Sequence, residues 1–97
     1  MKPAERIMAK LRSELGTLRK KYNVKGIGLF GSYVRGEQKK GSDVDILVEF
    51  REPIGLFKFL ELEEYLGELI GRKVDLVSKK ALKPRIGKRI LAEAVYA

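Results

Sequence analysis

Apolar residues recur along two stretches of the chain with the period of a helix. From Pro3 to about Lys21 they are spaced three and four residues apart, as on one face of a helix: Ile7, Leu11, Leu15, Leu18 and Tyr22. A second stripe runs over residues 56–70: Leu56, Phe59, Leu62, Leu66 and Leu69. Pro3 suits a first helical turn, and Gly71 suits the end of the second helix. The pattern therefore predicts two long helices.

Shorter apolar runs predict strands between and after these helices. We expect strands over 24–30, 43–50 and 73–77, and the second is so nearly continuous in apolar residues that it indicates a central strand. Residues 32–37 predict a short helix with Ser32 as its N-cap. Alternation of helices and strands favours an α/β or α+β fold with one layered sheet.

The end of the chain repeats this alternation on a smaller scale. Pro84 begins or limits a last helix that ends near Ala94, and residues 95–97 suit a short edge strand. No repeat or low-complexity tract interrupts the pattern. A length of 97 residues predicts a single domain over 1–97.

Composition excludes several kinds of site. The chain has no cysteine and no histidine, which rules out a disulfide framework, a thiolate- or histidine-ligated zinc and a Ser-His-Asp triad. The start of the chain lacks the apolar core of a signal peptide, and no apolar run approaches the length of a membrane span. We therefore expect a cytoplasmic protein that is not associated with a membrane.

Basic residues dominate the charge. The formal net charge is +8, and residues 72–89 contain eight Lys or Arg against one acid, Asp75. Such a segment attracts polyanions, including RNA and nucleoside triphosphates. A solvated basic surface without a ligand is the alternative.

The stretch from Gly31 to Glu49 carries the candidate chemistry. Asp43 and Asp45 are two residues apart in a predicted strand, so their carboxylates share one face and repel each other unless a cation lies between them. Mg²⁺ takes oxygen ligands, typically one or two carboxylates plus substrate phosphates. The Gly31-Ser32 turn offers N–H groups and a hydroxyl to a phosphate. Together these features indicate nucleotide chemistry.

Each of these residues also has a plainer interpretation. Asp43 can serve only as the entry to a strand, and Arg35 can be a surface residue. Asp45 is harder to explain in this way, because an acid between Val44 and Ile46 in a buried strand costs free energy unless it is paired or metal-bound.

The spacing of these residues resembles the nucleotidyltransferase superfamily related to DNA polymerase beta. The best match is its minimal nucleotidyltransferase branch, whose members are often encoded beside HEPN-domain partners. The resemblance covers the chain from about Val24 to its end and rests on Gly31, Ser32, Arg35, Gly36, Ser42, Asp43 and Asp45, with Asp75 as a later acidic residue on a strand. It implies the nucleotidyltransferase fold, a small mixed β-sheet with helices packed on it.

The resemblance also implies roles for the site residues. Asp43 and Asp45 would hold two Mg²⁺ ions. Asp75 would ligate the ion that activates the acceptor hydroxyl and could also accept the proton of that hydroxyl. Gly31 and Ser32 would bind the β- and γ-phosphates of ATP, and Arg35 would add positive charge at the leaving pyrophosphate. Gly36 would serve the backbone geometry of the turn.

The function implied is an enzyme that transfers AMP from ATP to a hydroxyl. In this family the acceptor can be a tyrosine of a HEPN toxin, which gives the protein an antitoxin role. Three alternatives stay open: transfer to an RNA 3′ hydroxyl, favoured by residues 72–89; a non-catalytic nucleotide-binding protein that masks a partner; and a basic nucleic-acid-binding module. The sequence also leaves the oligomeric state open, including a homo-oligomer.

Overall fold

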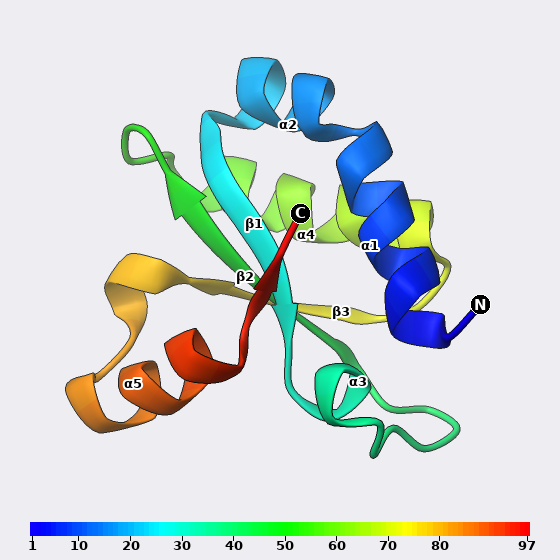
Figure 1. Ribbon diagram of the computed structural model, residues 1–97. Coiled ribbons are helices and arrows are strands. Elements are labelled where there is room, and N and C mark those ends of the chain that lie inside the picture. Colours follow the sequence, from blue (N-terminus) through cyan, green and yellow to red (C-terminus); the bar gives the residue numbers. More distant parts are fainter.

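A four-stranded mixed sheet forms the centre of the protein (Figure 1). The computed structural model describes all residues, 1–97. The strands are β1 (Val24–Phe30), β2 (Val44–Phe50), β3 (Val74–Ser78) and β4 (Val95–Tyr96). Their spatial order is β3-β2-β1-β4, with β2 parallel to β3 and β1 antiparallel to both β2 and β4. The mixed sheet, the central place of β2 and the short edge strand β4 confirm the predictions.

Five α-helices surround this sheet. They are α1 (Pro3–Ser13), α2 (Leu15–Tyr22), α3 (Ser32–Arg35), α4 (Leu56–Ile70) and α5 (Pro84–Glu93), and a short 3₁₀ helix, η1 (Lys79–Ala81), follows β3. The bounds of β1 and α4 are those predicted from the sequence. None of these helices combines the length and the apolar character needed to cross a bilayer.

The first helix differs from its prediction, because it divides at Glu14. Glu14 leaves helical geometry (φ −111°, ψ 10°), and its N–H bonds to the carbonyl of Leu11, three residues back. The change of direction keeps both halves of the apolar stripe on the sheet: Leu11 of α1 and Leu18 of α2 are fully buried. Periodicity alone could not show this break, because the stripe continues across it with the spacing of one helix.

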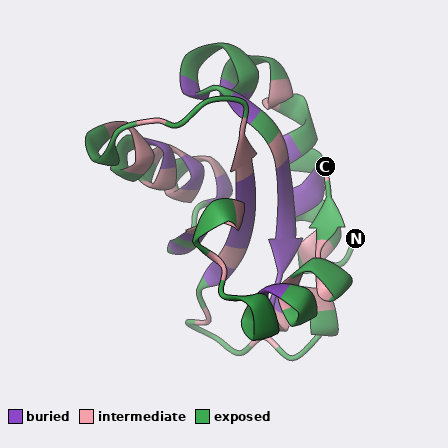
Figure 2. Ribbon diagram, turned by 90° about the vertical axis from the view of Figure 1, so that its left-hand side faces the viewer, coloured by how far each residue is buried: buried purple, intermediate pink, exposed green.

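The core lies on one face of the sheet, beneath α1, α2 and α4. Figure 2 shows the buried stretches of β1 and β2 at the centre of the protein, and alternate residues of the strands belong to the core cluster. These strand residues are Val24, Ile27, Leu29, Val44, Ile46, Val48, Val74 and Leu76. The residues between them, including Asp45 and Asp75, therefore project from the opposite face.

The predicted apolar face of α4 is correct except at its first turn. Leu62 and Leu66 are fully buried, whereas Leu56 is 69% exposed. Ile70, not named in the predicted stripe, is buried at the other end. Burial depends on which neighbours a helix turn meets, and this information is not contained in the spacing of its apolar residues.

Candidate active site

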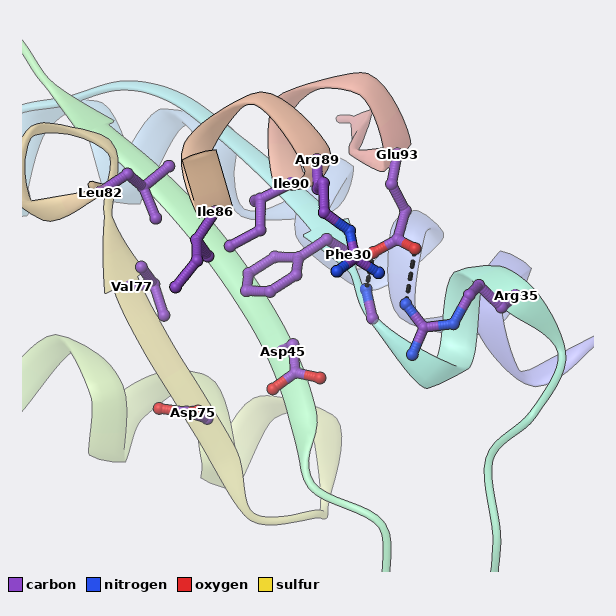
Figure 3. A pocket seen from close by; sticks show the side chains of 11 residues that line it. Phe30, Arg35, Asp45, Asp75, Val77, Leu82, Ile86, Arg89, Ile90 and Glu93 are labelled. Atoms are coloured by element: carbon purple, nitrogen blue, oxygen red, sulfur yellow. Dashed lines mark hydrogen bonds and ion pairs between the residues drawn. The ribbon is translucent and has the colours of Figure 1, made fainter. Parts of the chain in front are cut away.

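A cleft of about 510 Å³ opens on the face of the sheet opposite the core, where α5 meets the strands (Figure 3). It is lined by carboxylates, guanidinium groups and an apolar wall: Phe30, Gly31, Arg35, Asp45, Asp75, Val77, Leu82, Ile86, Arg89, Ile90 and Glu93. Of the six residues singled out from the sequence, the cleft brings four together. Ser32 and Asp43 do not line it.

Two carboxylates lie on neighbouring strands, on the same face of the sheet. Asp45 of β2 is in direct register with Asp75 of β3. Burial raises the pKa of Asp45, and the charges of Asp75 and Asp43 raise it further, against a smaller opposing effect of Arg35. The cleft therefore concentrates negative charge that a bound cation would relieve.

Asp75 is more accessible than its sequence neighbours predict. Like Asp45, it stands between apolar residues of a strand, yet Asp75 is exposed and Asp45 is half-buried. Val74 and Leu76 point into the core, so the alternation of the strand turns Asp75 outward. Because β3 is also an edge strand, fewer neighbours cover this residue.

The position of Asp43 also differs from its prediction. Strand β2 begins at Val44, so Asp43 lies one residue ahead of the strand and is exposed. Its charge still acts on Asp45. No three acidic side chains gather around one point in the structure. The paired carboxylates of Asp45 and Asp75 nevertheless fit Mg²⁺, which one or two carboxylates hold jointly with substrate phosphates.

Gly31 forms a turn that only glycine can adopt. Its backbone (φ 78°, ψ −153°) lies in a region closed to residues with a side chain. A Cβ at this position would also collide with the Asp45 carboxylate, which lies against the turn. The structure thus explains why this residue follows β1: it lets the backbone pass directly beside the acidic pair.

The prediction of a short helix over 32–37 with Ser32 as its N-cap was wrong at both ends. Gly31 is the N-cap of α3, and Ser32 is the first helical residue without a capping hydrogen bond from its side chain. The helix also ends at Arg35 instead of Glu37, because Gly36 takes a left-handed conformation (φ 72°) that stops it. The backbone role expected of Gly36 is confirmed.

Glu93, at the end of α5, is a site residue that the sequence did not reveal. Its Oε2 accepts a hydrogen bond of 2.7 Å from the Gly31 N–H, and its Oε1 accepts one of 2.6 Å from Arg35 Nη1 (dashed in Figure 3). Burial opposes the ionisation of Glu93, but the bonds from Arg35 and Gly31 outweigh it and lower its pKa. Arg35 also donates through Nε to Glu37, and the bonds to Glu37 and Glu93 raise the Arg35 pKa.

The register of β4 explains how Glu93 reaches this position. Gly28 pairs with Tyr96, and Leu29 pairs with Val95. Extending this antiparallel register by two residues places Glu93 level with Gly31. The predicted edge strand was the available signal, but its partner strand and register were not known from the sequence.

Comparison with known proteins gives the family of the chain. The nucleotidyltransferase domain family matches residues 8–97. The chain belongs to this family. It is 54% identical over 92 residues to the protein adenylyltransferase MntA of Thermococcus cleftensis, with 95% of this chain and 93% of the relative covered.

Solved structures agree with this assignment. One, described provisionally as a minimal nucleotidyltransferase, superposes with a TM-score of 0.81 at 34% identity, covering 98% of this chain and 95% of that one. Another is a toxin–antitoxin crystal structure with AMP-PNP, with a TM-score of 0.71 at 25% identity and coverage of 96% and 70%. The expected nucleotidyltransferase fold is confirmed.

The basic segment of this nucleotidyltransferase does not form one cluster around the cleft. Arg72 and Lys73 precede β3, whereas the other basic residues of 72–89 follow it on η1 and α5 or between them. A strand of five residues separates the two groups by about 17 Å. Only Arg89 lines the cleft. It lies beside Ile86 and Ile90 of the apolar wall, a surface suited to a planar ring such as a nucleobase.

Proposed function

We propose that this protein is an Mg²⁺-dependent nucleotidyltransferase that moves AMP from ATP to a tyrosine hydroxyl of a HEPN-domain toxin, and thereby acts as an antitoxin. The observation that carries the proposal is that N–H donors and paired carboxylates line the same cleft. Gly31 and Arg35 supply the donors, and Asp45 and Asp75 supply the carboxylates. The donors suit phosphate, and the carboxylates suit a cation that is itself bound to phosphate.

The phosphate end of the cleft would hold the β- and γ-phosphates. The Gly31 N–H and the Arg35 guanidinium point toward the same place, since both now bind the one carboxylate of Glu93. Ser32 follows directly and would add its hydroxyl. These donors would stabilise the negative charge that develops on the leaving pyrophosphate.

The carboxylate end would hold the metal. Asp45 and Asp75, with Asp43 from just ahead of the strand, would ligate Mg²⁺, two ions in the full site. The bound metal supplies Lewis-acid stabilisation of the phosphoryl oxygens. Asp75, the more exposed of the two paired residues, would also be accessible to the incoming acceptor.

In the proposed reaction, the acceptor oxygen forms a bond to the α-phosphorus of ATP. The bond from this phosphorus to the oxygen that bridges to the β-phosphate breaks, and pyrophosphate leaves with the electron pair. The acceptor proton passes to the Asp75 carboxylate. The product is a phosphodiester between AMP and the acceptor.

The choice of substrates is supported by the relatives. The Thermococcus relative is named a protein adenylyltransferase, and the AMP-PNP structure is a toxin–antitoxin assembly. Both favour an adenine nucleotide and a protein acceptor for this chain. The basic residues of η1 and α5 keep an RNA 3′ hydroxyl as the second candidate acceptor.

The test is transfer of label from ATP in the presence of Mg²⁺ and a lysate of the source organism. With ATP labelled at the α-phosphate, we expect one labelled protein with the wild type and none with Asp45→Asn. With ATP labelled at the γ-phosphate we expect no transfer by the protein, because that phosphate leaves in pyrophosphate. Using both labels separates AMP transfer from phosphorylation.

Other outcomes would redirect the proposal. Label in RNA would move the acceptor to a 3′ end. If neither protein transfers label and both still bind a partner equally well, the catalytic proposal is rejected in favour of masking by contact.

A further inference from the structure

The groups assigned to phosphate binding are already occupied within the chain. The Gly31 N–H donates to Glu93 Oε2 at 2.7 Å, and Arg35 Nη1 donates to Glu93 Oε1 at 2.6 Å. Figure 3 shows the Glu93 side chain descending from α5 onto both donors. A carboxylate presents two anionic oxygens, as a phosphate edge does, and therefore satisfies the same pair of donors.

A nucleotide phosphate and Glu93 cannot use these donors together. The Gly31 N–H carries one hydrogen, and it points at the Glu93 oxygen. A phosphate brought to the same place would also lie within a few ångströms of the Glu93 charge, and like charges at this distance repel strongly in a partly buried site.

We infer that Glu93 is an internal competitor of the nucleotide: its carboxylate must leave Gly31 and Arg35 before the phosphates of ATP can bind. This inference rests on the proposed function, because it takes Gly31 and Arg35 as the phosphate donors. Glu93 thus sets the nucleotide affinity of the site, although it belongs neither to the carboxylate pair nor to the phosphate cradle, which is formed by Gly31 and Arg35.

The attachment of α5 allows such a displacement. Glu93 is the last residue of α5, and β4, which follows it, is a strand of only two residues, supplemented by one backbone hydrogen bond from Ala97 to the carbonyl of Ile27. Val95 and Tyr96 of this strand are 45% and 46% exposed. Gly87 is the only buried residue of α5. Segments with few buried contacts open at low free-energy cost, so this end of the chain can move without unfolding the core.

The displacement would also reshape the cleft. Ile86, Arg89 and Ile90 of α5 form part of its lining. A movement that frees the phosphate donors therefore changes the apolar wall at the same time. Binding of ATP therefore favours the displaced position of α5, and displacement of α5 in turn favours binding of ATP.

The competition acts only on ligands that carry phosphates. ATP requires the open form, so its observed dissociation constant is the intrinsic one divided by the fraction of open protein. Adenosine makes no use of Gly31 or Arg35 and has no reason to displace Glu93. The two ligands therefore separate competition at the cradle from a general change in the cleft.

The test measures binding of ATP and adenosine, each with Mg²⁺, to wild type, Glu93→Gln and Glu93→Ala by isothermal titration calorimetry. We expect the dissociation constant for ATP to fall about three- to tenfold in Glu93→Ala and by less in Glu93→Gln, while that for adenosine changes by much less, through the apolar wall alone. Glu37→Gln is the matched control: Glu37 also pairs with Arg35 but does not touch Gly31. We expect it to change the ATP affinity by less than about twofold.

Two results would overturn the inference. Equal ATP affinity with and without Glu93 shows that there is no competition. Weaker ATP binding in both Glu93 variants, with unchanged circular dichroism, shows that Glu93 positions Arg35 for the nucleotide. If no protein in the set binds ATP, or if Arg35→Gln binds it as well as wild type, the proposed phosphate cradle itself fails. These last results are distinguishable from failure of the competition alone.

Discussion

Asp45 of β2 is in register with Asp75 of the parallel strand β3, and its carboxylate at the same time lies against the backbone of Gly31. One side chain therefore joins the acidic pair to the turn that would bind phosphate. The arrangement is useful for chemistry and unfavourable for stability, since burial and neighbouring charges both disfavour the ionised form of Asp45. Several predictions about the free protein depend on this conflict.

Neutralising Asp45 should stabilise the protein while removing its activity. The folded-state pKa of Asp45 lies above its ordinary value of 3.8. Protonation of Asp45 therefore favours the folded state. This contribution is complete below pH 3.8 and is lost as the pH rises through the folded-state pKa. At pH 7 the carboxylate is therefore a cost. In the absence of divalent cations, we expect Asp45→Asn to raise Tm by about 2–6 °C. A gain of 1 kcal/mol in the free energy of unfolding corresponds to a rise in Tm of about 4–8 °C in a domain of this size.

The control for this measurement is Asp43→Asn, which removes only a neighbouring charge. It should raise Tm by less than Asp45→Asn when both are measured by differential scanning fluorimetry. A lower Tm for Asp45→Asn would mean that the carboxylate makes favourable contacts that outweigh its burial.

Divalent cations should stabilise the wild type through the same pair. A cation between Asp45 and Asp75 relieves their repulsion, and a ligand at ten times its dissociation constant adds about 1.4 kcal/mol to the free energy of unfolding. Chelation with EDTA should reverse the gain. We expect Asp45→Asn to lose it, at an ionic strength matched with NaCl. An equal rise of Tm in both proteins would point to binding elsewhere.

Replacing Gly31 by alanine should damage both the fold and the site. The backbone at Gly31 lies in a region that costs other residues about 1–3 kcal/mol, and the added methyl group would displace the Asp45 carboxylate. Urea unfolding should show a loss of at least this size, together with loss of AMP transfer.

Gly16→Ala is the matched glycine control. Gly16 lies in α2, has no positive φ, and has no atom within 4 Å of a Cβ placed on it. Its replacement should stabilise the protein by about 0.5–1 kcal/mol, because alanine costs less backbone entropy in a helix. If both variants lose stability equally, the special geometry of Gly31 is not the cause.

The Glu93 contact should make stability depend on pH in the acid range. The folded-state pKa of Glu93 lies below its ordinary value of 4.5, so its contribution is present above that value and is lost as the pH falls through the folded pKa. We expect Glu93→Gln to reduce the fall in stability between about pH 5 and pH 3. The measurement is urea unfolding of both proteins at a series of pH values. Parallel curves for the two proteins would contradict the assignment.

Much of the site could be predicted from the sequence because its residues follow local rules. Alternation along β2 and β3 determines the face of the sheet from which Asp45 and Asp75 project. The residues on either side of each Asp lie in the core, which confirms that both Asp residues are on the opposite face. The turn at Gly31 and the helix over 56–70 are likewise local features. These elements are predictable because any extended or helical chain places residues of this spacing on the same faces.

Other features required the folded chain. Periodicity specified the elements, but not that Asp75 would stand beside Asp45, that α1 would divide from α2 at Glu14, or that Glu93 would cover Gly31 and Arg35. Strand order, register and the place of a chain end depend on hydrogen bonds and packing between segments far apart in the sequence. Local sequence thus establishes which side chains each strand offers for chemistry, whereas packing between distant segments establishes which of them meet in the cleft.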